Sequence, residues 1–505
     1  MVDRHLLIIG GGLAGLSAGC YALRSGFKTT LVEHNTVLGG VCTSWERGPY
    51  TIDGCIHWLT GGPFQQVYEE LDILPAVPLH TLQTWATYRD AHDGLEVAFT
   101  RDLDALVKQL TAISPADAAE LARMRVGVRE MLALHPPLDA QELGHLGEQL
   151  REFWHARGAL GTLVHFRGTV GDWTQNRLQG ERLRRIFTRM VPETAPVAFL
   201  LMVLGYLEQG YLSRPVGGTA AFRDALIQTY RALGGEVRLD ATVEEILVTE
   251  GRATGVRLVD GTQLAADAVL STSSAPETVL RMLGGVYDAG PTRERLANWQ
   301  LFEPIVLASF GVAAPYADAP SLMTLDGERP FDVGGRLVDC YTVRVCNDDA
   351  CFAPKEHTVI QAIMPTDYAW WTAQGAHYAE AKAAVAEVAL TALERHFPNL
   401  RAQVRETDVA TPLTYWNLSR SWQGSFEGWM PRAGGMFGHV KKTLAGLEGF
   451  YMAGQWVEPG GGVPMALTSG RQAIQLLCHD AHQPFVPTSK ALRPTEAASA
   501  SYAGH

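Results

Sequence analysis

The chain has 505 residues, more than one hydrophobic core usually serves, so we expect two or three domains. Hydrophobic residues make up 47% and charged residues 19% of the sequence, as in a soluble globular protein. The net charge of −12 argues against nucleic acid as a partner. No charged leader precedes the first apolar run, and the seven scattered cysteines form no disulfide framework or CxxC pair, so we expect a cytoplasmic protein with reduced thiols.

The first 35 residues have the pattern of a nucleotide-binding unit. Residues 6–9 form an apolar run typical of a buried parallel strand, and Gly10, Gly12 and Gly15 follow it with GxGxxG spacing. In such a turn the first glycine permits a tight bend, the second lets backbone approach a pyrophosphate, and the third lets the helix pack on the strand. The helix N-terminus then offers N–H groups and a positive dipole end to the anion.

The acid that closes the second strand indicates which ligand is bound. Residues 29–32 form this strand, and Glu33 lies 18 residues after Gly15, where a carboxylate can hydrogen-bond a ribose 2′-OH. An arginine at this place would instead suit a 2′-phosphate. The sequence therefore predicts FAD or NAD rather than NADP.

A second glycine pair makes the pattern more specific. Gly39 and Gly40 precede the segment Y-T-I-D-G at 50–54, and this combination resembles the FAD-binding half of the phytoene desaturase, carotenoid isomerase and retinol saturase family. The resemblance implies an α/β fold, with a Rossmann-like FAD-binding domain of the glutathione-reductase type and an inserted α+β substrate domain. It implies FAD contacts from Gly10, Gly12, Leu13, Ala14, Gly15, Glu33, His34, Gly39, Gly40 and Val41.

One position departs from that family. An arginine usually follows the glycine pair directly, whereas this chain has Val41. The change removes a cation from the neighbourhood of the pyrophosphate. We therefore expect flavin affinity to depend more on backbone N–H groups and on the helix dipole.

Two later blocks resemble the rest of the family's FAD-binding domain. Residues 214–275 have the pattern of a helix and a small β-unit, in which the resemblance implies that Val243 contacts the adenine. Residues 445–483 contain a strand, a glycine-rich turn and a helix whose N-terminus is directed at the flavin in that family. The residues matched to this second contact are Gly454, Gly462, Val463, Pro464 and Met465. We assign residues 1–63, 214–275 and 445–483 to one discontinuous FAD-binding domain.

Residues 64–213 have a mainly helical pattern and form a possible membrane-contact or substrate-entry region. Within it, the basic amphipathic stretch 182–190 is either a solvated helix face or a contact for anionic lipid headgroups. The apolar run 196–204 is well short of the roughly 20 residues that span a bilayer. We interpret 195–212 as a buried helix or as the wall of a tunnel for a long apolar substrate.

The remaining chain is assigned to a substrate domain, residues 276–444, and a disordered tail, residues 484–505. The segment TPLTYWNLSRSWQGSFEGWMP at 411–431 is loop-like, and it suits a cavity near the flavin and ordinary core packing about equally. Cys346 and Cys351 have no histidine at ligand spacing. We therefore predict no metal site and interpret them as a turn between strands.

The resemblance implies redox chemistry on a long, apolar isoprenoid polyene, by desaturation, saturation or cis–trans isomerisation at the flavin. Two residues are candidates for proton transfer: Glu458, just before the glycine turn, and His57, in a loop expected to return to the ring. Alternatively, Glu458 hydrogen-bonds FAD or local backbone, and His57 is a packed loop residue. The sequence has no second glycine fingerprint for an NADPH domain, so a quinone, oxygen or a diffusing acceptor would reoxidise the flavin.

Two other functions remain open. A flavin amine oxidase shares the architecture, although its usual aromatic pair around the substrate nitrogen cannot be placed on this sequence. A non-catalytic binder of prenylated partners, like the escort proteins of this fold, does not need a tightly held flavin. The two intact glycine turns count against that binder.

Overall fold

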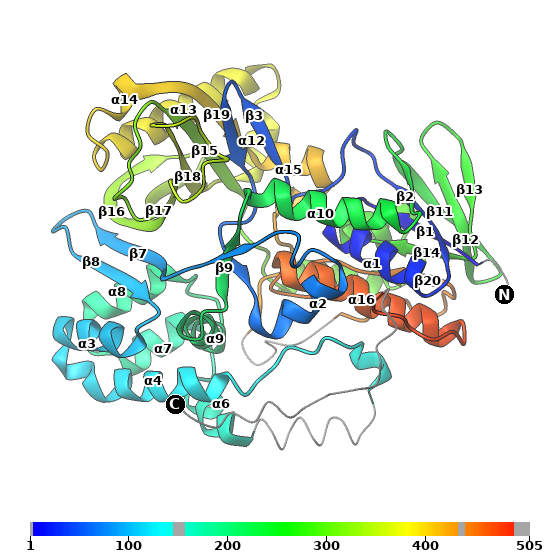
Figure 1. Ribbon diagram of the computed structural model, residues 1–505, viewed down its shortest axis with the longest axis horizontal. Coiled ribbons are helices and arrows are strands. Elements are labelled where there is room, and N and C mark those ends of the chain that lie inside the picture. The colour runs from blue at the N-terminus through cyan, green and yellow to red at the C-terminus, as the bar shows by residue number, and fades with distance from the viewer. Residues whose placement is uncertain (1–3, 145–156, 433–439, 489–505) are drawn as a thin grey trace.

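The computed structural model describes residues 4–144, 157–432 and 440–488. Its centre is a five-stranded parallel sheet with the order β10-β2-β1-β14-β20. These strands are β1 (His5–Ile9), β2 (Lys28–Val32), β10 (Glu236–Arg238), β14 (Ala268–Ser271) and β20 (Phe450–Met452). The sheet thus takes strands from all three segments that the sequence assigns to FAD binding (Figure 1).

Both faces of this sheet are covered, by different elements, which explains why residues 6–9 of β1 are all apolar. Leu6 and Ile8 pack against three helices, α1 (Leu13–Arg24), α10 (Gly218–Ala232) and α16 (Gly462–Asp480). Leu7 and Ile9 pack against a small antiparallel sheet of β11 (Val243–Thr249), β12 (Arg252–Leu258) and β13 (Gln263–Ala265). A parallel strand buried on both faces has no solvent side, so no polar residue interrupts the run.

A seven-stranded mixed sheet forms the second part of the molecule, with the order β19-β15-β18-β17-β16-β7-β8. Its strands are β7 (Thr84–Asp90), β8 (Glu96–Thr100), β15 (Ile305–Val312), β16 (Leu322–Asp332), β17 (Leu337–Cys346), β18 (Thr358–Pro365) and β19 (Val404–Ala410). The helices of the same part are α12 (Tyr368–Ala373), α13 (Tyr378–Glu394), α14 (Leu400–Gln403) and α15 (Pro412–Ser419). Helix α11 (Ala289–Asn298) instead contacts the helical turn at Pro276–Met282. Cys346 ends β17, and the connection to β18 contains Cys351, which confirms the predicted turn between strands.

Residues 64–213 are less purely helical than the sequence pattern predicts. The helices are α2 (Gln65–Glu70), α3 (Leu103–Ile113), α4 (Ala118–Met131), α6 (Leu160–His165), α7 (Val170–Arg177), α8 (Glu181–Met190) and α9 (Val197–Glu208). Between α2 and α3, however, the hairpin β7–β8 joins the seven-stranded sheet, because β7 pairs in parallel with β16. This pairing spans more than 230 residues of sequence, which local pattern cannot detect. The expected boundary between a helical region and the substrate domain is therefore wrong at this hairpin.

Two short sheets connect the parts. β3 (Ser44–Arg47) pairs with β4 (Tyr50–Asp53), and β9 (Leu212–Pro215) lies between β5 (Leu59–Thr60) and β6 (Leu79–Thr81). The indole of Trp45 on β3 donates to Asp408 on β19 at 3.0 Å. The β3–β4 hairpin is thus held against the edge of the seven-stranded sheet.

The tail predicted to be disordered begins with ordered residues. Phe485 packs against Tyr21 on α1 with 5.5 Å between the ring centroids, and the Val486 N–H donates to Ser25. Phe485 is thus ordered by an apolar contact with α1, which the low apolar content of the tail does not predict. Residues 489–505 lie outside the described part of the chain.

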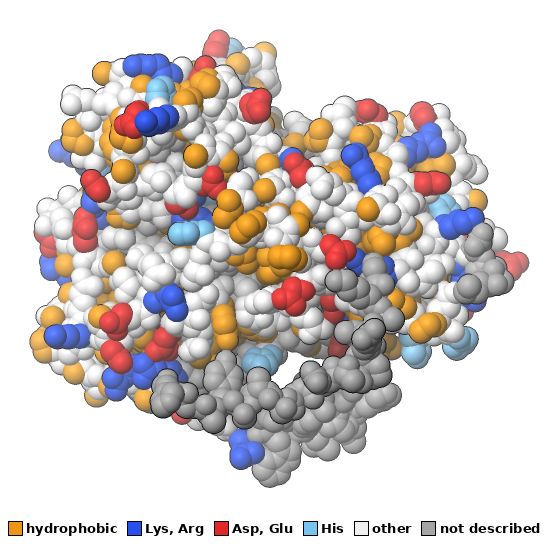
Figure 2. Space-filling view, in the orientation of Figure 1, with side chains coloured by type: hydrophobic (Ala, Val, Ile, Leu, Met, Phe, Trp, Pro, Cys, Tyr) orange, Lys and Arg blue, Asp and Glu red, His pale blue; other side chains and the backbone are white. Residues whose placement is uncertain are grey.

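The basic stretch 182–190 coincides with α8, and its charges are engaged by neighbours. Arg182 pairs with Asp93, Arg185 with Asp326 and Arg189 with Asp339, at 2.5 to 2.7 Å. Basic and acidic side chains are interspersed over the helical part on the face shown in Figure 2. Because the arginines are paired within the protein, α8 does not offer the free cationic face expected of a lipid contact. In the described part of the chain, no helix has both the length and the apolar character to cross a membrane.

Candidate active site

Two helix N-termini open into one cavity. The glycine turn after β1 leads into α1, whose N-cap residue is Gly12, and the turn after β20 leads into α16, whose N-cap residue is Gly461. No side chain caps either helix. The first-turn N–H groups of both helices therefore need partners from outside their helix, and their dipoles favour an anion.

Glycines hold the first turn and the next loop close together. The Gly39 N–H donates to the Gly11 carbonyl at 2.9 Å, and a Cβ placed on Gly40 would lie 3.2 Å from the Cα of Gly12. Gly40 also has a φ of +58°, which a residue with a side chain adopts only with strain. The backbone of this cradle is thus exposed to whatever occupies the cavity.

Glu33 organises the same region. One carboxylate oxygen accepts from the Gly11 N–H at 2.7 Å, and the other accepts from the Asn35 N–H at 2.9 Å and lies 2.8 Å from Nδ1 of His34. Each oxygen has two lone-pair directions, so the carboxylate can still accept from a ribose hydroxyl. This position is the one that the spacing of the glycine turn predicts.

The predicted cofactor contacts line a single cavity of about 880 Å³, with one exception. They are Gly10, Gly12, Leu13, Ala14, Glu33, His34, Gly39, Gly40, Val41, Val243, Gly454, Gly462, Val463, Pro464 and Met465. The exception is Gly15, which lies behind the turn, where any Cβ would collide with the backbone of Gly10. Gly15 therefore permits close packing of helix on strand and does not itself reach the cavity.

Two arginines that the sequence did not single out also line the cavity. Arg281 donates to the Val243 carbonyl at 3.2 Å and pairs with Glu277 at 2.5 Å. Arg420 lies over the ring of Trp416, 5.5 Å from its centroid. They come from segments far from the glycine pair. The cavity therefore contains positive charge although Val41 stands where the family usually has an arginine.

The other end of the cavity is apolar. Helix α9 contributes Phe199, Met202, Val203 and Tyr206, which share one face because they are spaced three or four residues apart. Trp85 on β7 and Leu307 on β15 line it as well. Most of the 195–212 segment thus forms a buried helix, Val197–Glu208, which is also a wall of the cavity. Residues from the 411–431 segment also line the cavity, which favours a cavity over core packing there, although Pro412–Ser419 is helical.

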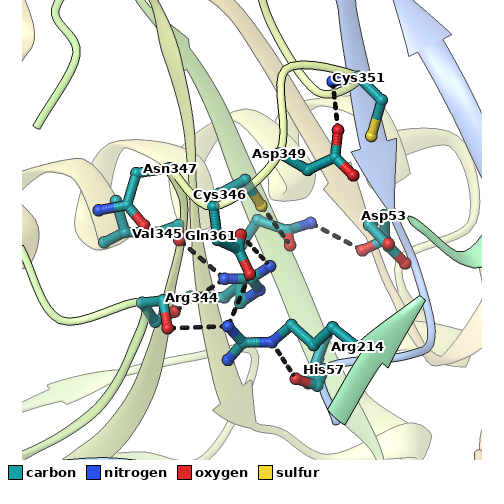
Figure 3. Close-up of polar contacts among 12 residues, drawn as sticks. Asp53, His57, Arg214, Arg344, Val345, Cys346, Asn347, Asp349, Cys351 and Gln361 are labelled. Atoms are coloured by element: carbon teal, nitrogen blue, oxygen red, sulfur yellow. Dashed lines mark hydrogen bonds and ion pairs between the residues drawn. The ribbon is translucent and has the colours of Figure 1, made fainter. Parts of the chain in front are cut away.

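A polar cluster supports the loop that carries His57 (Figure 3). Arg214 on β9 donates to the His57 carbonyl at 2.7 Å and pairs with Asp348, which also pairs with Arg344 on β17 at 2.7 Å. The Asp53 carbonyl accepts from Gln361 on β18 at 2.9 Å. The cluster therefore ties the 53–57 segment to the seven-stranded sheet.

His57 lines the cavity, as expected for a loop that returns to it, but its protonation does not suit the expected role. Burial, together with the charges of Arg344 and Arg214, lowers the pKa of His57 to about 3. An imidazole with that pKa is neutral at pH 7 and holds a proton too weakly to take one from carbon. His57 is better suited to shaping the cavity than to proton transfer.

Glu458 is placed differently from the expectation. It is 6% exposed, does not line the cavity, and pairs with the buried Lys442 at 2.6 Å. The structure therefore corrects the proton-transfer hypothesis for Glu458 and assigns it to an internal ion pair.

Glu427 is the acid that the cavity contains instead. It lines the cavity beside the second glycine turn, and a Cβ on Gly461 would lie 2.6 Å from its backbone oxygen. No hydrogen bond or ion pair joins its carboxylate to another residue within the described ranges. Burial raises the pKa of Glu427 to about 7. Sequence reasoning missed this residue, because a single acid within GSFEGW has neither periodicity nor motif spacing.

Comparison with known proteins agrees with this geometry. Residues 13–478 match the model of one family, described as flavin containing amine oxidoreductase. The chain belongs to the flavin-containing amine oxidoreductases. This flavoenzyme is an oxidoreductase that uses FAD, and the resemblance inferred from its motifs is confirmed. A non-catalytic escort function is thereby set aside.

Relatives of this flavoenzyme include carotenoid enzymes. It is 25% identical to the phytoene desaturase (neurosporene-forming) of Rhodobacter capsulatus, over 96% of this chain and 95% of the relative. It is 24% identical to the prolycopene isomerase 1 of an Oncidium hybrid, over 92% and 82% respectively.

Solved structures share the fold. An oxidoreductase from Methanosarcina mazei has a TM-score of 0.61 with 17% identity, covering 93% of this chain and all of that one. Cyclohexylamine oxidase from Brevibacterium oxydans has a TM-score of 0.59 with 15% identity, covering 95% and 100%. These likenesses confirm the predicted α/β fold, in which a Rossmann-like part is joined to a second part.

The residues present fit FAD. Uncapped N-termini of α1 and α16 can hold the pyrophosphate and an electron-rich edge of the flavin, and the glycine cradle leaves backbone exposed between them. Glu33 is positioned for a ribose hydroxyl, and Val243 lines the cavity with β11 behind it.

Proposed function

We propose that this flavoenzyme acts on a long, apolar, unsaturated lipid of the carotenoid kind. The observation that supports this best is the single cavity, which runs from the FAD-binding glycine turns to an apolar end walled by α9 and the substrate sheet. An extended apolar molecule can be held there mainly by burial of its surface. The relatives named as phytoene desaturase and prolycopene isomerase support the same substrate class.

The protein's own residues bind and orient this substrate. The apolar side chains of α9, together with Trp85 and Leu307, exclude water from the substrate end. When bound, FAD supplies the redox chemistry, by accepting or returning an electron pair with hydrogen. Each of the three reactions, desaturation, saturation and isomerisation, requires the reacting carbon–carbon bond of the substrate to lie beside that cofactor.

Substrates of this class reside in membranes, so we further propose that the protein takes its substrate from a bilayer surface. Helix α8 is not offered as the contact, because its arginines pair with Asp93, Asp326 and Asp339. The electron acceptor is proposed to be a quinone, oxygen or another diffusing molecule.

Amine oxidation is the second candidate function, and one observation favours it. A cationic amine needs a negative partner, and Glu427 is a carboxylate in the cavity without an internal partner among the described residues. The aromatic side chains at the substrate end are also compatible with a cation. A polyene needs an apolar cavity, whereas a cationic amine needs a charged partner. Direct comparison of the two substrates can therefore distinguish the two functions.

The test is anaerobic mixing of the purified holoenzyme with phytoene in liposomes, with prolycopene in liposomes, and with putrescine, each followed by flavin absorbance and product analysis. Oxidised flavin bleached by phytoene supports desaturation, reduced flavin reoxidised by a polyene supports saturation, and prolycopene converted without net flavin change supports isomerisation. Bleaching by putrescine alone would reject the polyene proposal in favour of amine oxidation.

A further inference from the structure

We propose that Glu427 is the catalytic residue that takes up or returns the substrate proton in this cavity. The inference rests on the proposed action on a carbon–carbon bond of an apolar polyene. It replaces Glu458, whose carboxylate is held by Lys442 away from the cavity.

The position of Glu427 is fixed by two segments that both line the cavity. Its backbone packs against Gly461, where a Cβ would lie 2.6 Å from its oxygen, and its Oε1 would lie 3.9 Å from a Cβ on Gly462. Cys55 in the 53–57 loop is near enough for the charge of Glu427 to contribute to raising the pKa of its thiol. Glu427 therefore lies in the cavity beside the uncapped N-terminus of α16 and within electrostatic range of the 53–57 loop.

The surroundings keep the carboxyl available for a proton. No other described residue hydrogen-bonds or pairs with it, and burial brings its pKa to about 7, near the pH at which a general base works best. The titratable groups on the packed segments do not compete. Cys55 has a pKa raised by its hydrogen bond to Cys42 and by burial, His57 is neutral, and Glu458 is paired with Lys442.

The proposed step conserves atoms and electrons. In desaturation, one C–H bond gives its hydrogen and electron pair to oxidised FAD, and the neighbouring C–H bond gives its hydrogen as a proton to an Oε atom of Glu427. The electrons of that second bond form the new C=C bond. Saturation is the reverse, with the proton returning from protonated Glu427 and the electron pair from reduced FAD.

The experiment compares the wild type with Glu427→Gln, Glu427→Asp and the control Glu380→Gln, whose side chain is exposed on α13. Each holoenzyme is mixed anaerobically with phytoene liposomes when oxidised and with lycopene liposomes when reduced. The rate of flavin absorbance change is measured from pH 5.5 to 8.5, and FAD dissociation constants are measured separately. For Glu427→Gln we expect a loss of about 100-fold or more in rate, with FAD affinity within about twofold of the wild type.

The pH profile gives a second readout. In the wild type, the bleaching rate should rise as pH passes through about 7, where Glu427 loses its proton, and this rise should be absent in Glu427→Gln. Glu427→Asp should recover part of the rate and keep a titration, whereas the control should match the wild type.

Two results would overturn the inference while leaving the proposed function intact, and a third would overturn both. A reactive wild type with an equally fast Glu427→Gln variant rejects proton transfer by Glu427. A rate loss matched by loss of FAD affinity assigns Glu427 to cofactor binding. A wild type that reacts with putrescine and with neither polyene rejects the proposed function itself, together with this inference.

Discussion

At the scale of single residues, the environment of the cavity decides which ionisable groups can act. His57 and Glu427 both line it, yet burial moves their pKa values to about 3 and about 7. In each case burial disfavours the charged form, so the histidine loses its proton and the acid keeps one. Of these two groups, the acid is the one left with a pKa near neutral pH.

The depressed pKa of His57 predicts a specific acid sensitivity. Between its folded pKa of about 3 and its ordinary value of 6.5, the unfolded chain binds a proton that the folded protein does not. Stability is therefore unaffected above pH 6.5 and falls as the pH drops below it. The full shift corresponds to about 5 kcal/mol, and we expect about 3 kcal/mol because part of the ring faces the water-accessible cavity.

The measurement is urea unfolding of the wild type and of His57→Phe at pH 7.5 and pH 4.5. We expect the phenylalanine variant to lose clearly less stability between the two pH values. Equal losses in both proteins would show that His57 is as easily protonated in the folded state as in the unfolded chain.

At the scale of elements, the site depends on how two helices approach each other. The N-termini of α1 and α16 open into the same cavity, and the helices cross closely at Gly470. A Cβ at Gly470 would lie 2.6 Å from the Ala14 carbonyl oxygen and 2.9 Å from the Ala18 nitrogen. These are backbone atoms of α1, which cannot move aside without shifting the helix.

We therefore predict that Gly470→Ala separates α1 from α16, lowers stability by about 1–3 kcal/mol, and weakens FAD binding. Thermal unfolding and the FAD content of the purified protein measure the two effects. The control is Gly290→Ala on α11, where nothing lies within 4 Å of an added Cβ and a slight stabilisation is expected. Full FAD content and an unchanged melting temperature in Gly470→Ala would contradict the close crossing.

At the scale of the whole molecule, long-range pairings join the helical region to the substrate sheet. Asp326 on β16 is fully buried and accepts from Tyr88 on β7 and from Arg185 on α8, each at 2.6 Å. Arg189 of the same helix also contacts this carboxylate, at 3.1 Å. One acid thus connects β7, β16 and α8, and so positions the wall that contributes Met190 to the cavity.

Removing that acid should loosen the attachment. We predict that Asp326→Ala costs about 3 kcal/mol in the free energy of unfolding, because Tyr88 and both arginines lose a buried partner. The matched control is Asp339→Ala, whose side chain is 42% exposed and which pairs with Arg189 alone among the α8 arginines, so its loss should cost under about 1 kcal/mol. Denaturant unfolding measures both, and similar costs for the two variants would contradict the proposed connection.

The sequence by itself determined the FAD-binding part of this protein. The strand, the glycine turn, Glu33 and the second glycine turn are local patterns whose spacing follows from the geometry of a bound dinucleotide, so their roles could be predicted without a structure. The tertiary structure alone decided the rest. Contacts between distant segments determine the β7–β16 pairing, the burial of Asp326 and the presence of Glu427 rather than Glu458 in the cavity. Side-chain direction at a turn and pKa shifts caused by burial leave no signature in the local sequence.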